Sequence, residues 1–229
     1  MSEIPDISTI FFYIITRGLP ATLLLTAIGL LLGLLLGLSL ALIRLYGIKE
    51  LQIIANAYEK LMRGIPLLVL IFIFAFGLPT EFFWYIDPLF RPVYTVILAL
   101  GLRSAAYQSQ IFRGAILSVN PGQMEAARAL GMSDIKAFRH IIFPQALRLA
   151  LPSWSNEYAI VIKDSSFAYA VGVIEMTRAG YRVSSGFPQL WSLSMAIVAI
   201  CYFLFTYPIT RFVGEGQSKK LKKLGMGGG

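Results

Sequence analysis

Residues 20–43 read PATLLLTAIGLLLGLLLGLSLALI and carry no charged side chain from end to end. About 20 apolar residues in an α-helix suffice to cross the hydrocarbon core of a bilayer. We therefore predict a membrane-spanning helix here. Gly29, Gly33 and Gly37 share one face of this helix, and small residues at that spacing let a second helix approach closely. We expect the second helix to belong to this chain, with a partner subunit as the alternative.

The composition of the whole chain agrees with a membrane location. Of the 229 residues, 57% are hydrophobic and only 14% are charged, and the formal net charge is +8. A soluble domain has about 25% charged residues, so this chain lacks the means to cover a water-facing surface. Its apolar runs are too long for barrel strands and too apolar for a disordered chain. We predict an all-α integral membrane protein.

Five membrane-spanning helices are predicted within a single domain that covers residues 1–229. Their ranges are 20–43, 52–78, 93–117, 143–170 and 190–212. The second range is interrupted at Arg63, Gly64 and Pro66, and a proline inside a helix removes a backbone donor and breaks or kinks it. The apolar residues 7–16 are too few to cross a bilayer, so we expect them to lie flat in the interface.

Basic residues decide the predicted orientation, because loops rich in lysine and arginine stay on the cytoplasmic side. The loop after the third span and the C-terminal tail are basic, through Arg128, Lys136, Arg139, Arg148, Lys219, Lys220, Lys222 and Lys223. Both are therefore expected inside, so the C-terminus lies inside. An odd number of spans then places the N-terminus outside, although Arg178 and Arg182 on that side argue weakly against it.

The loop at about residues 120–143 contains a short predicted helix. In NPGQMEAARALG, residues 120–131, Asn120 suits the N-cap, Pro121 the first helical position and Gly131 the C-terminal stop. We expect three turns, with Glu125 and Arg128 paired on the surface. Alanines keep parts of this helix thin, which favours insertion into a groove of a partner protein. The alternative is an ordinary amphipathic connector.

This loop resembles the EAA loop of ABC importer permeases, which docks on the ATPase subunit. The resemblance rests on EAA at 125–127, the glycine at 131 and IIFP at 141–144. Similarity to the polar amino acid permeases of histidine, glutamine and arginine importers extends to RGIPLL at 63–68, SAAY at 104–107, IFRG at 111–114 and KDSS at 163–166. Ser109-Gln110 and Ser166 depart from the pattern of many such permeases.

The resemblance implies the type I ABC importer permease arrangement, as a multi-pass protein of the bacterial cytoplasmic (inner) membrane. It implies two ATPase subunits, an extracytoplasmic solute-binding protein and a second permease copy, either identical (a homodimer) or different (a heterodimer). The residues implied in docking on the ATPase are Glu125, Ala126, Ala127, Arg128 and Gly131. Membrane lipid surrounds such a protein, and nucleic acid is not an expected partner.

Catalytic and metal-binding residues are not expected on this chain. Cys201 and His140 are its only cysteine and its only histidine, which leaves no cysteine cluster and no nucleophile with a base. A G-x-x-x-x-G-K-[ST] phosphate loop does not occur in the sequence, so we expect ATP and Mg²⁺ on the partner ATPase. A passive channel is the rival from another class, and it gives no reason for a groove-fitting helix.

Polar residues near the middle of the second, third and fourth spans are the candidates for substrate binding, because charges at that depth are costly and face a cavity or one another. They are Arg103, Ser104, Tyr107, Ser153, Asn156, Glu157 and Asp164, together with the apolar Met62. Glu157 is expected to bind an amino group and Arg103 a carboxylate, since an amino acid needs partners of both signs. The alternative for Glu157 is an ion pair with Arg103 or Arg63.

For Asp164 we expect a structural pair with its neighbour Lys163, since both lie near the outer end of the fourth span. The predicted solute is a polar, basic amino acid such as arginine, histidine or lysine. Glutamine or another polar amino acid is the alternative.

Overall fold

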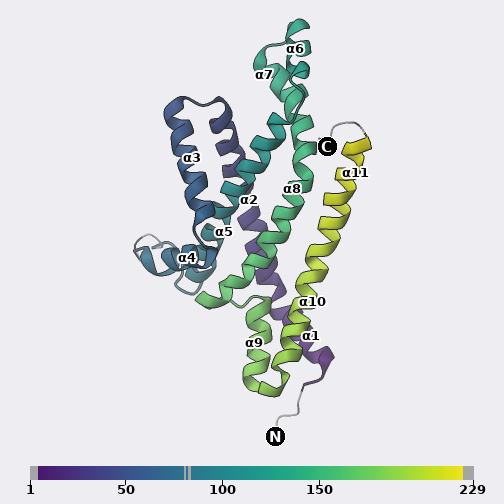
Figure 1. Cartoon of the computed structure of the whole chain (residues 1–229). Coiled ribbons are helices and arrows are strands. Elements are labelled where there is room, and N and C mark those ends of the chain that lie inside the picture. Colours follow the sequence, from purple (N-terminus) through teal and green to yellow (C-terminus); the bar gives the residue numbers. More distant parts are fainter. Residues whose placement is uncertain (1–4, 80, 82–83, 224–229) are drawn as a thin grey trace.

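The computed structural model describes residues 5–79, 81 and 84–223 of the chain (Figure 1). Within these ranges the regular structure is helical and no strand is formed, so the all-α prediction is confirmed. The elements in chain order are α1 (Ile7–Arg17), α2 (Leu19–Tyr46), α3 (Lys49–Gly64), α4 (Leu67–Phe72), η1 (Ile73–Gly77), α5 (Arg91–Leu117), α6 (Gly122–Ala129), α7 (Asp134–Ala137), η3 (Phe138–Ile142), α8 (Phe143–Asp164), η4 (Ser165–Val171), α9 (Met176–Gly186), η5 (Pro188–Leu190), α10 (Trp191–Ile209), η6 (Thr210–Glu215) and α11 (Gly216–Lys223).

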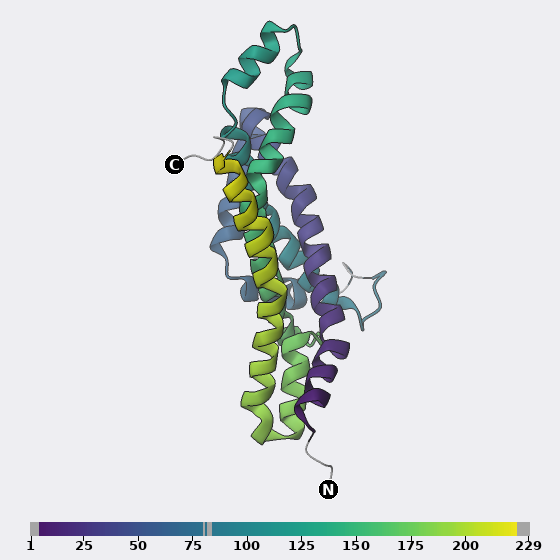
Figure 2. The same ribbon diagram turned by 90° about the vertical axis from the view of Figure 1, so that its right-hand side faces the viewer.

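The molecule is an elongated bundle. The loop that carries α6 and α7 projects from one end, and α1 and α9 lie at the opposite end (Figures 1 and 2). The C-terminal helix α11 points toward the end that carries the α6 loop. The orientation of the chain in the membrane stays a prediction. The side chains of Lys220, Lys222 and Lys223, which entered the prediction of orientation, lie outside the described residues.

The first predicted span extends further toward the N-terminus than expected. Only Gly18 separates α1 from α2, and the two form one helical segment of 40 residues, Ile7–Tyr46. Ile10 and Ile14 of α1 are buried in a cluster with Met176 of α9. The prediction that residues 7–16 lie flat in the interface is therefore wrong, because the apolar side of α1 packs on protein and continues the line of α2.

The second predicted span is broken where the sequence indicated. α3 ends at Gly64, α4 begins at Leu67, and the two segments meet at an angle of 104°. Pro66 lies between them and has no backbone N–H to continue the hydrogen bonding of α3. As a result α4 runs across the long axis of the bundle instead of along it (Figure 1).

The closest helix packing in the molecule joins α2 to α5. A Cβ atom at Gly37 would lie 2.8 Å from Cβ of Gln108 and 2.9 Å from the carbonyl oxygen of Ala105. At Gly33 it would lie 2.6 Å from Nε2 of Gln108. The glycine face of α2 therefore serves packing within the chain, as expected, because only a residue without a Cβ permits this approach.

Helices also form in the fourth and fifth predicted ranges, with shifted boundaries. α8 ends at Asp164 and the chain continues as the 3-10 helix η4, so the helix predicted over 143–170 is shorter than expected. α10 continues through η6 into α11 as one segment, Pro188–Lys219. Among the described residues, two segments are able to cross a membrane by length and composition, or three if α3 and the bent α4–η1 segment are counted as one span. The count of five spans therefore stays a prediction.

Candidate functional site

A buried polar cluster joins α5 to α8. The Ser104 hydroxyl donates a hydrogen bond of 2.7 Å to Glu157, and the Gln108 amide donates one of 3.0 Å to Ser104. The indole N–H of Trp154 donates a hydrogen bond of 2.9 Å to the side-chain oxygen of Gln108. The side-chain amide of Gln108 also donates one of 3.1 Å to the backbone carbonyl of Leu30. Glu157 is only 3% exposed. The structure thus brings Ser104 and Glu157 together, as the sequence suggested, and adds Gln108, which sequence reasoning missed.

An ion pair lies beside this cluster. Arg103 of α5 pairs with Asp164 at the end of α8, and their side chains are 20% and 18% exposed. The expected pair of Asp164 with Lys163 is therefore wrong, because Asp164 pairs with Arg103. The alternative of an ion pair for Glu157 is wrong as well, because Glu157 forms none among the described residues. The reason is geometric, because Lys163 follows a different face of α8 and is exposed.

The ring of Tyr107 lies between two guanidinium groups. Arg103 is 5.0 Å from the ring centroid and Arg63 of α3 is 5.2 Å from it. Both distances are within the range of a cation–π interaction. Tyr107 therefore belongs to the same group as Arg103, as its position one turn further along α5 suggested.

The remaining predicted site residues lie elsewhere. Asn156 is exposed and lines a cavity of about 410 Å³ between α8 and the η6–α11 segment, and Ser153 is exposed as well. Met62 packs against the apolar cluster built by α2, α4 and α5. The structure therefore does not bring these three side chains to Glu157. One-residue steps along a helix turn by about 100°, so Asn156 and Glu157 face different neighbours.

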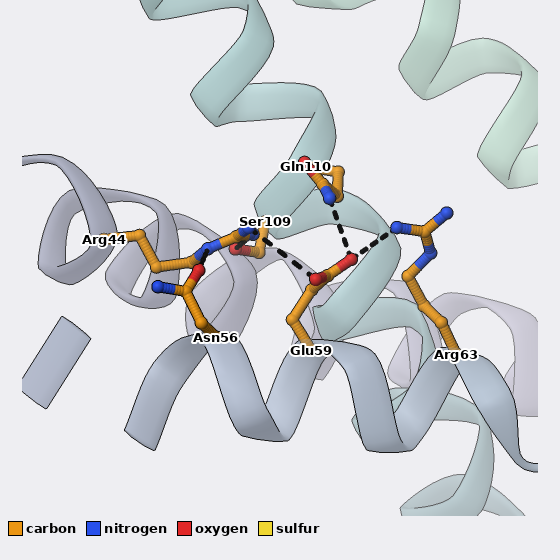
Figure 3. A network of polar contacts seen from close by, with 6 residues as sticks. All are labelled: Arg44, Asn56, Glu59, Arg63, Ser109 and Gln110. Carbon is orange, nitrogen blue, oxygen red and sulfur yellow. Dashed lines mark hydrogen bonds and ion pairs between the residues drawn. The ribbon is translucent and has the colours of Figure 1, made fainter. Parts of the chain in front are cut away.

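A second polar network lies between α2, α3 and α5 (Figure 3). At its centre Glu59, 3% exposed, accepts hydrogen bonds from Arg63 and from the Gln110 amide, the latter at 2.9 Å. Its other oxygen lies 3.6 Å from Arg44. Asn56 and Ser109 hold the rest of the Arg44 guanidinium, at 2.7 and 3.2 Å. The sequence analysis named Arg63 only at the break of the second span and as an alternative partner of Glu157, and it did not predict this network.

A third buried carboxylate, Glu175, lies at the other end of the bundle. It caps the first turn of α9 by accepting hydrogen bonds from the backbone N–H groups of Thr177 and Arg178, at 2.7 and 2.8 Å. The hydroxyl of Tyr202 on α10 donates to it at 2.9 Å. The sequence analysis did not predict this cap, and the signal that would have revealed it is an acidic residue directly before a helix.

The α6 loop differs in detail from the prediction. α6 has eight residues, and Arg128 donates a hydrogen bond of 2.8 Å to Asp134 in place of the expected pair with Glu125. The hydrogen bond from Arg128 and its positive charge lower the pKa of Asp134. Ala127 is buried against the loop, whereas Glu125 and Ala126 are exposed. Gly131 has a φ of 76°, which confirms its predicted role as the stop residue.

The loop also presents apolar surface. Leu130 and Ile135 are 81% and 82% exposed. A cavity of about 550 Å³ lies between the loop and the end of α2, and Met124, Ile135 and Tyr46 are part of its wall. Exposed large apolar residues beside a charged helix are typical of a surface that contacts another protein.

The described residues contain no group of three or more histidine, cysteine, aspartate or glutamate side chains placed to hold a metal ion. Buried ionic groups on helices, a broken helix and a projecting loop together define a class: an all-helical membrane permease. The chain belongs to the family described as "Binding-protein-dependent transport system inner membrane component", which its residues 29–214 match. As a permease subunit it is not catalytic, and the ATPase is a separate partner.

Two relatives illustrate the family. The nopaline transport system permease protein NocM of Agrobacterium fabrum is 38% identical over 203 residues, which cover 86% of this chain and 83% of NocM. The probable amino-acid permease protein YxeN of Bacillus subtilis is 35% identical over 195 residues, which cover 85% and 86%.

Solved structures agree with this assignment. The crystal structure of an amino acid ABC transporter with histidines matches with a TM-score of 0.81 and 30% identity, over 96% of this chain and 99% of that chain. An inward-facing structure of the MetNI methionine ABC transporter matches with a TM-score of 0.64 over 89% of this chain and 92% of that one. At 20% identity the second match shows a shared type I permease fold.

Proposed function

We propose that this chain is the permease subunit of an ABC uptake system for a polar, basic amino acid in the bacterial cytoplasmic membrane. The observation that carries the proposal is that the buried Ser104–Glu157 hydrogen bond and the neighbouring Arg103–Asp164 ion pair place both charge signs between α5 and α8; together these four residues are called the α5–α8 cluster below. Charges inside a membrane domain are costly and mark solute paths. The names of the relatives, which include nopaline, octopine and L-cystine transport permeases, support a solute with amino acid chemistry.

The Arg103–Asp164 pair is the accessible part of the cluster, so the solute meets it first. An amino acid carries a carboxylate and an ammonium group, and it replaces the pair by offering each partner the opposite charge. Glu157 lies one step deeper, and the hydroxyl of Ser104 covers it at 2.7 Å. A cationic side chain of the solute binds the Glu157 carboxylate once the Ser104 hydroxyl turns away from it. This second carboxylate is why we favour a basic solute over glutamine.

Around this path the chain forms five spans, with the N-terminus outside and the C-terminus inside. The α6 loop docks on an ATPase that binds ATP and Mg²⁺. Exposure of Glu125 and Ala126 at the tip of the molecule supports this role. Two ATPase subunits, a second permease copy and an extracytoplasmic solute-binding protein complete the transporter. We favour a homodimer because the cluster already contains both charge signs.

The solute is tested with the purified complex of this permease and its ATPase in liposomes. ATP hydrolysis is measured with arginine, histidine, lysine, glutamine and leucine, each delivered on the outer side with the binding protein. We expect the basic amino acids to stimulate hydrolysis most and leucine not to stimulate it. Stimulation by glutamine alone would contradict a basic solute and favour glutamine, the alternative. Downhill flux of the solute without ATP would contradict an ATP-driven permease.

Docking is tested on the α6 loop. Glu125→Arg reverses an exposed charge, and Gly131→Pro removes the positive φ at the stop residue. We expect the double variant to lose ATP-driven uptake while the permease keeps its fold. The matched control is Glu50→Gln on the exposed N-terminal turn of α3. Unchanged uptake in the double variant would refute docking through this loop.

A further inference from the structure

The Glu59 network and the α5–α8 cluster are joined by one chain of side chains. Arg63 contacts Glu59 with its guanidinium group and faces the ring of Tyr107 at 5.2 Å. The same ring faces Arg103 at 5.0 Å, and Arg103 pairs with Asp164. An uninterrupted path of ionic and cation–π contacts therefore runs from α3 through α5 to α8.

The two ends of this path differ in how firmly they are held. Glu59 is anchored by Arg44, Arg63 and Gln110 from three helices, and it is buried (Figure 3). Arg103, in contrast, relies on Asp164 and on the Tyr107 ring, and its Nε atom is buried with no hydrogen-bond partner among the described residues. The position of Arg103 thus depends on the orientation of that ring.

The charges explain why Glu59 matters for that orientation. Two guanidinium groups beside one ring repel each other, and each stays in place because a carboxylate holds its other side. Asp164 holds Arg103, and Glu59 holds Arg63. The side chain of Arg63 is 42% exposed, so it is free to leave the ring when Glu59 loses its charge. Tyr107 then loses one of the two side chains that fix the orientation of its ring. The ring turns more freely, and its contact with Arg103 weakens.

We infer that Glu59 is a positioning residue for the solute site: through Arg63 and Tyr107 it fixes Arg103 beside Asp164, and thereby sets the affinity of the α5–α8 cluster without touching the solute. This inference rests on the proposed function, because it assigns a role to Arg103 at that site. It gives the network of Figure 3 a task beyond joining α2, α3 and α5.

The test is a set of variants of the reconstituted complex, with KM and maximal rate of ATP-driven uptake measured for the amino acid that wild type transports best from a panel of arginine, histidine, lysine and glutamine. We expect Glu59→Gln to raise KM about tenfold with a maximal rate within about twofold of wild type, the signature of weakened solute binding. Tyr107→Leu removes the ring and is expected to raise KM by at least as much.

The route is tested by combining the two changes. If Glu59 acts through the ring, Glu59→Gln in the Tyr107→Leu protein raises KM no further, because the two side chains lie on one path. Tyr107→Phe keeps the ring and is expected to rescue KM. If KM in the double variant rises by the product of the two single fold-changes, the inference is overturned.

A purely structural role is separated by a matched control. Asn56→Ala removes a hydrogen bond to Arg44 in the same network but leaves Arg63 and Tyr107 untouched. We expect it to lower the Tm of the complex and to leave KM unchanged. An Asn56→Ala protein whose KM rises as much as that of Glu59→Gln would overturn the inference, as would a Glu59→Gln protein with lowered Tm and wild-type KM.

Two further outcomes are decisive. If Glu59→Gln does not assemble, Arg63→Gln carries the same expectation for KM, because Glu59 then keeps Arg44 and Gln110, and an unchanged KM there overturns the inference. A wild-type complex that takes up none of the four amino acids contradicts the proposed function and the inference with it. Normal wild-type uptake with unchanged KM in the variants contradicts the inference alone.

Discussion

Helix α5 has two faces that are built on different principles. Toward α2 it meets a row of glycines, and the contact is so close that a Cβ at Gly37 would lie 2.9 Å from a backbone oxygen. Toward α3 and α8 it presents Arg103, Tyr107 and Gln110, whose partners are charged or aromatic groups. The first face depends on shape and the second on charge. A change of volume should therefore damage the first face most, and a change of charge at constant volume the second.

The largest effect is expected from Gly37→Ala. Alanine favours a helix over glycine by about 1 kcal/mol, but here its methyl group meets backbone and side-chain atoms of α5 at 2.8 to 2.9 Å. We expect a net loss of about 2 kcal/mol and a lower Tm in detergent, because neither helix is able to move away. The control is Gly114→Ala, which has nothing within 4 Å and should keep or raise Tm. A Gly37→Ala protein as stable as wild type would contradict the conclusion that the contact between α2 and α5 depends on shape.

A smaller effect on stability, with a larger one on transport, is expected from Asp164→Asn. The change keeps the volume and removes the charge that holds Arg103, whose side chain is partly buried. We expect a loss of about 1 kcal/mol, reduced by the partial exposure of the pair, and uptake below about one tenth of wild type. Glu215→Gln is the matched control, because its pair with Arg211 is half exposed at 3.9 Å. Equal effects of both variants would show that burial of the pair is unimportant.

The smallest effect is expected in the α6 loop. Arg128 lowers the pKa of Asp134 below its usual value of 3.8. A lowered pKa in the folded state stabilises the fold at pH above the unfolded value, and this contribution is lost as the pH falls through the folded value. Asp134→Asn should therefore lower Tm slightly at pH 7 and by less as the pH falls to 3, measured by thermal denaturation in detergent. The same difference at both pH values would mean that the pair contributes through shape and not through charge.

The two faces of α5 also differ in how well the sequence predicts them. The spacing of Gly29, Gly33 and Gly37 was enough to predict a close helix contact, because the helical repeat places them on one face whatever the neighbour is. It did not decide between a helix of this chain and one of a partner subunit. The break at Pro66 was predictable in the same way, since proline acts on its own helix. Both features depend only on local geometry.

The partners on the charged face were not predictable. The helical repeat places Arg103 and Glu157 on known faces of their helices, but the pairing depends on the crossing and the relative shift of α5 and α8. As a result Glu157 accepts a hydrogen bond from the Ser104 hydroxyl, and Arg103 forms an ion pair with Asp164. Arg128 is a similar case, because its partner Asp134 lies across a turn that the sequence did not place. Asn156 was predicted at the solute site, but it precedes Glu157 by one residue on α8 and therefore faces a different side of the helix.

We propose that the charged side of α5 lines the path of a basic amino acid. The KM of arginine uptake relative to that of glutamine tests this proposal in Glu157→Gln, compared with wild type and with Glu50→Gln on the exposed surface. We expect Glu157→Gln to raise the KM of arginine about tenfold more than that of glutamine, because only the cationic solute loses an opposite charge, and we expect Glu50→Gln to change neither KM. An arginine KM that is unchanged in Glu157→Gln would contradict it.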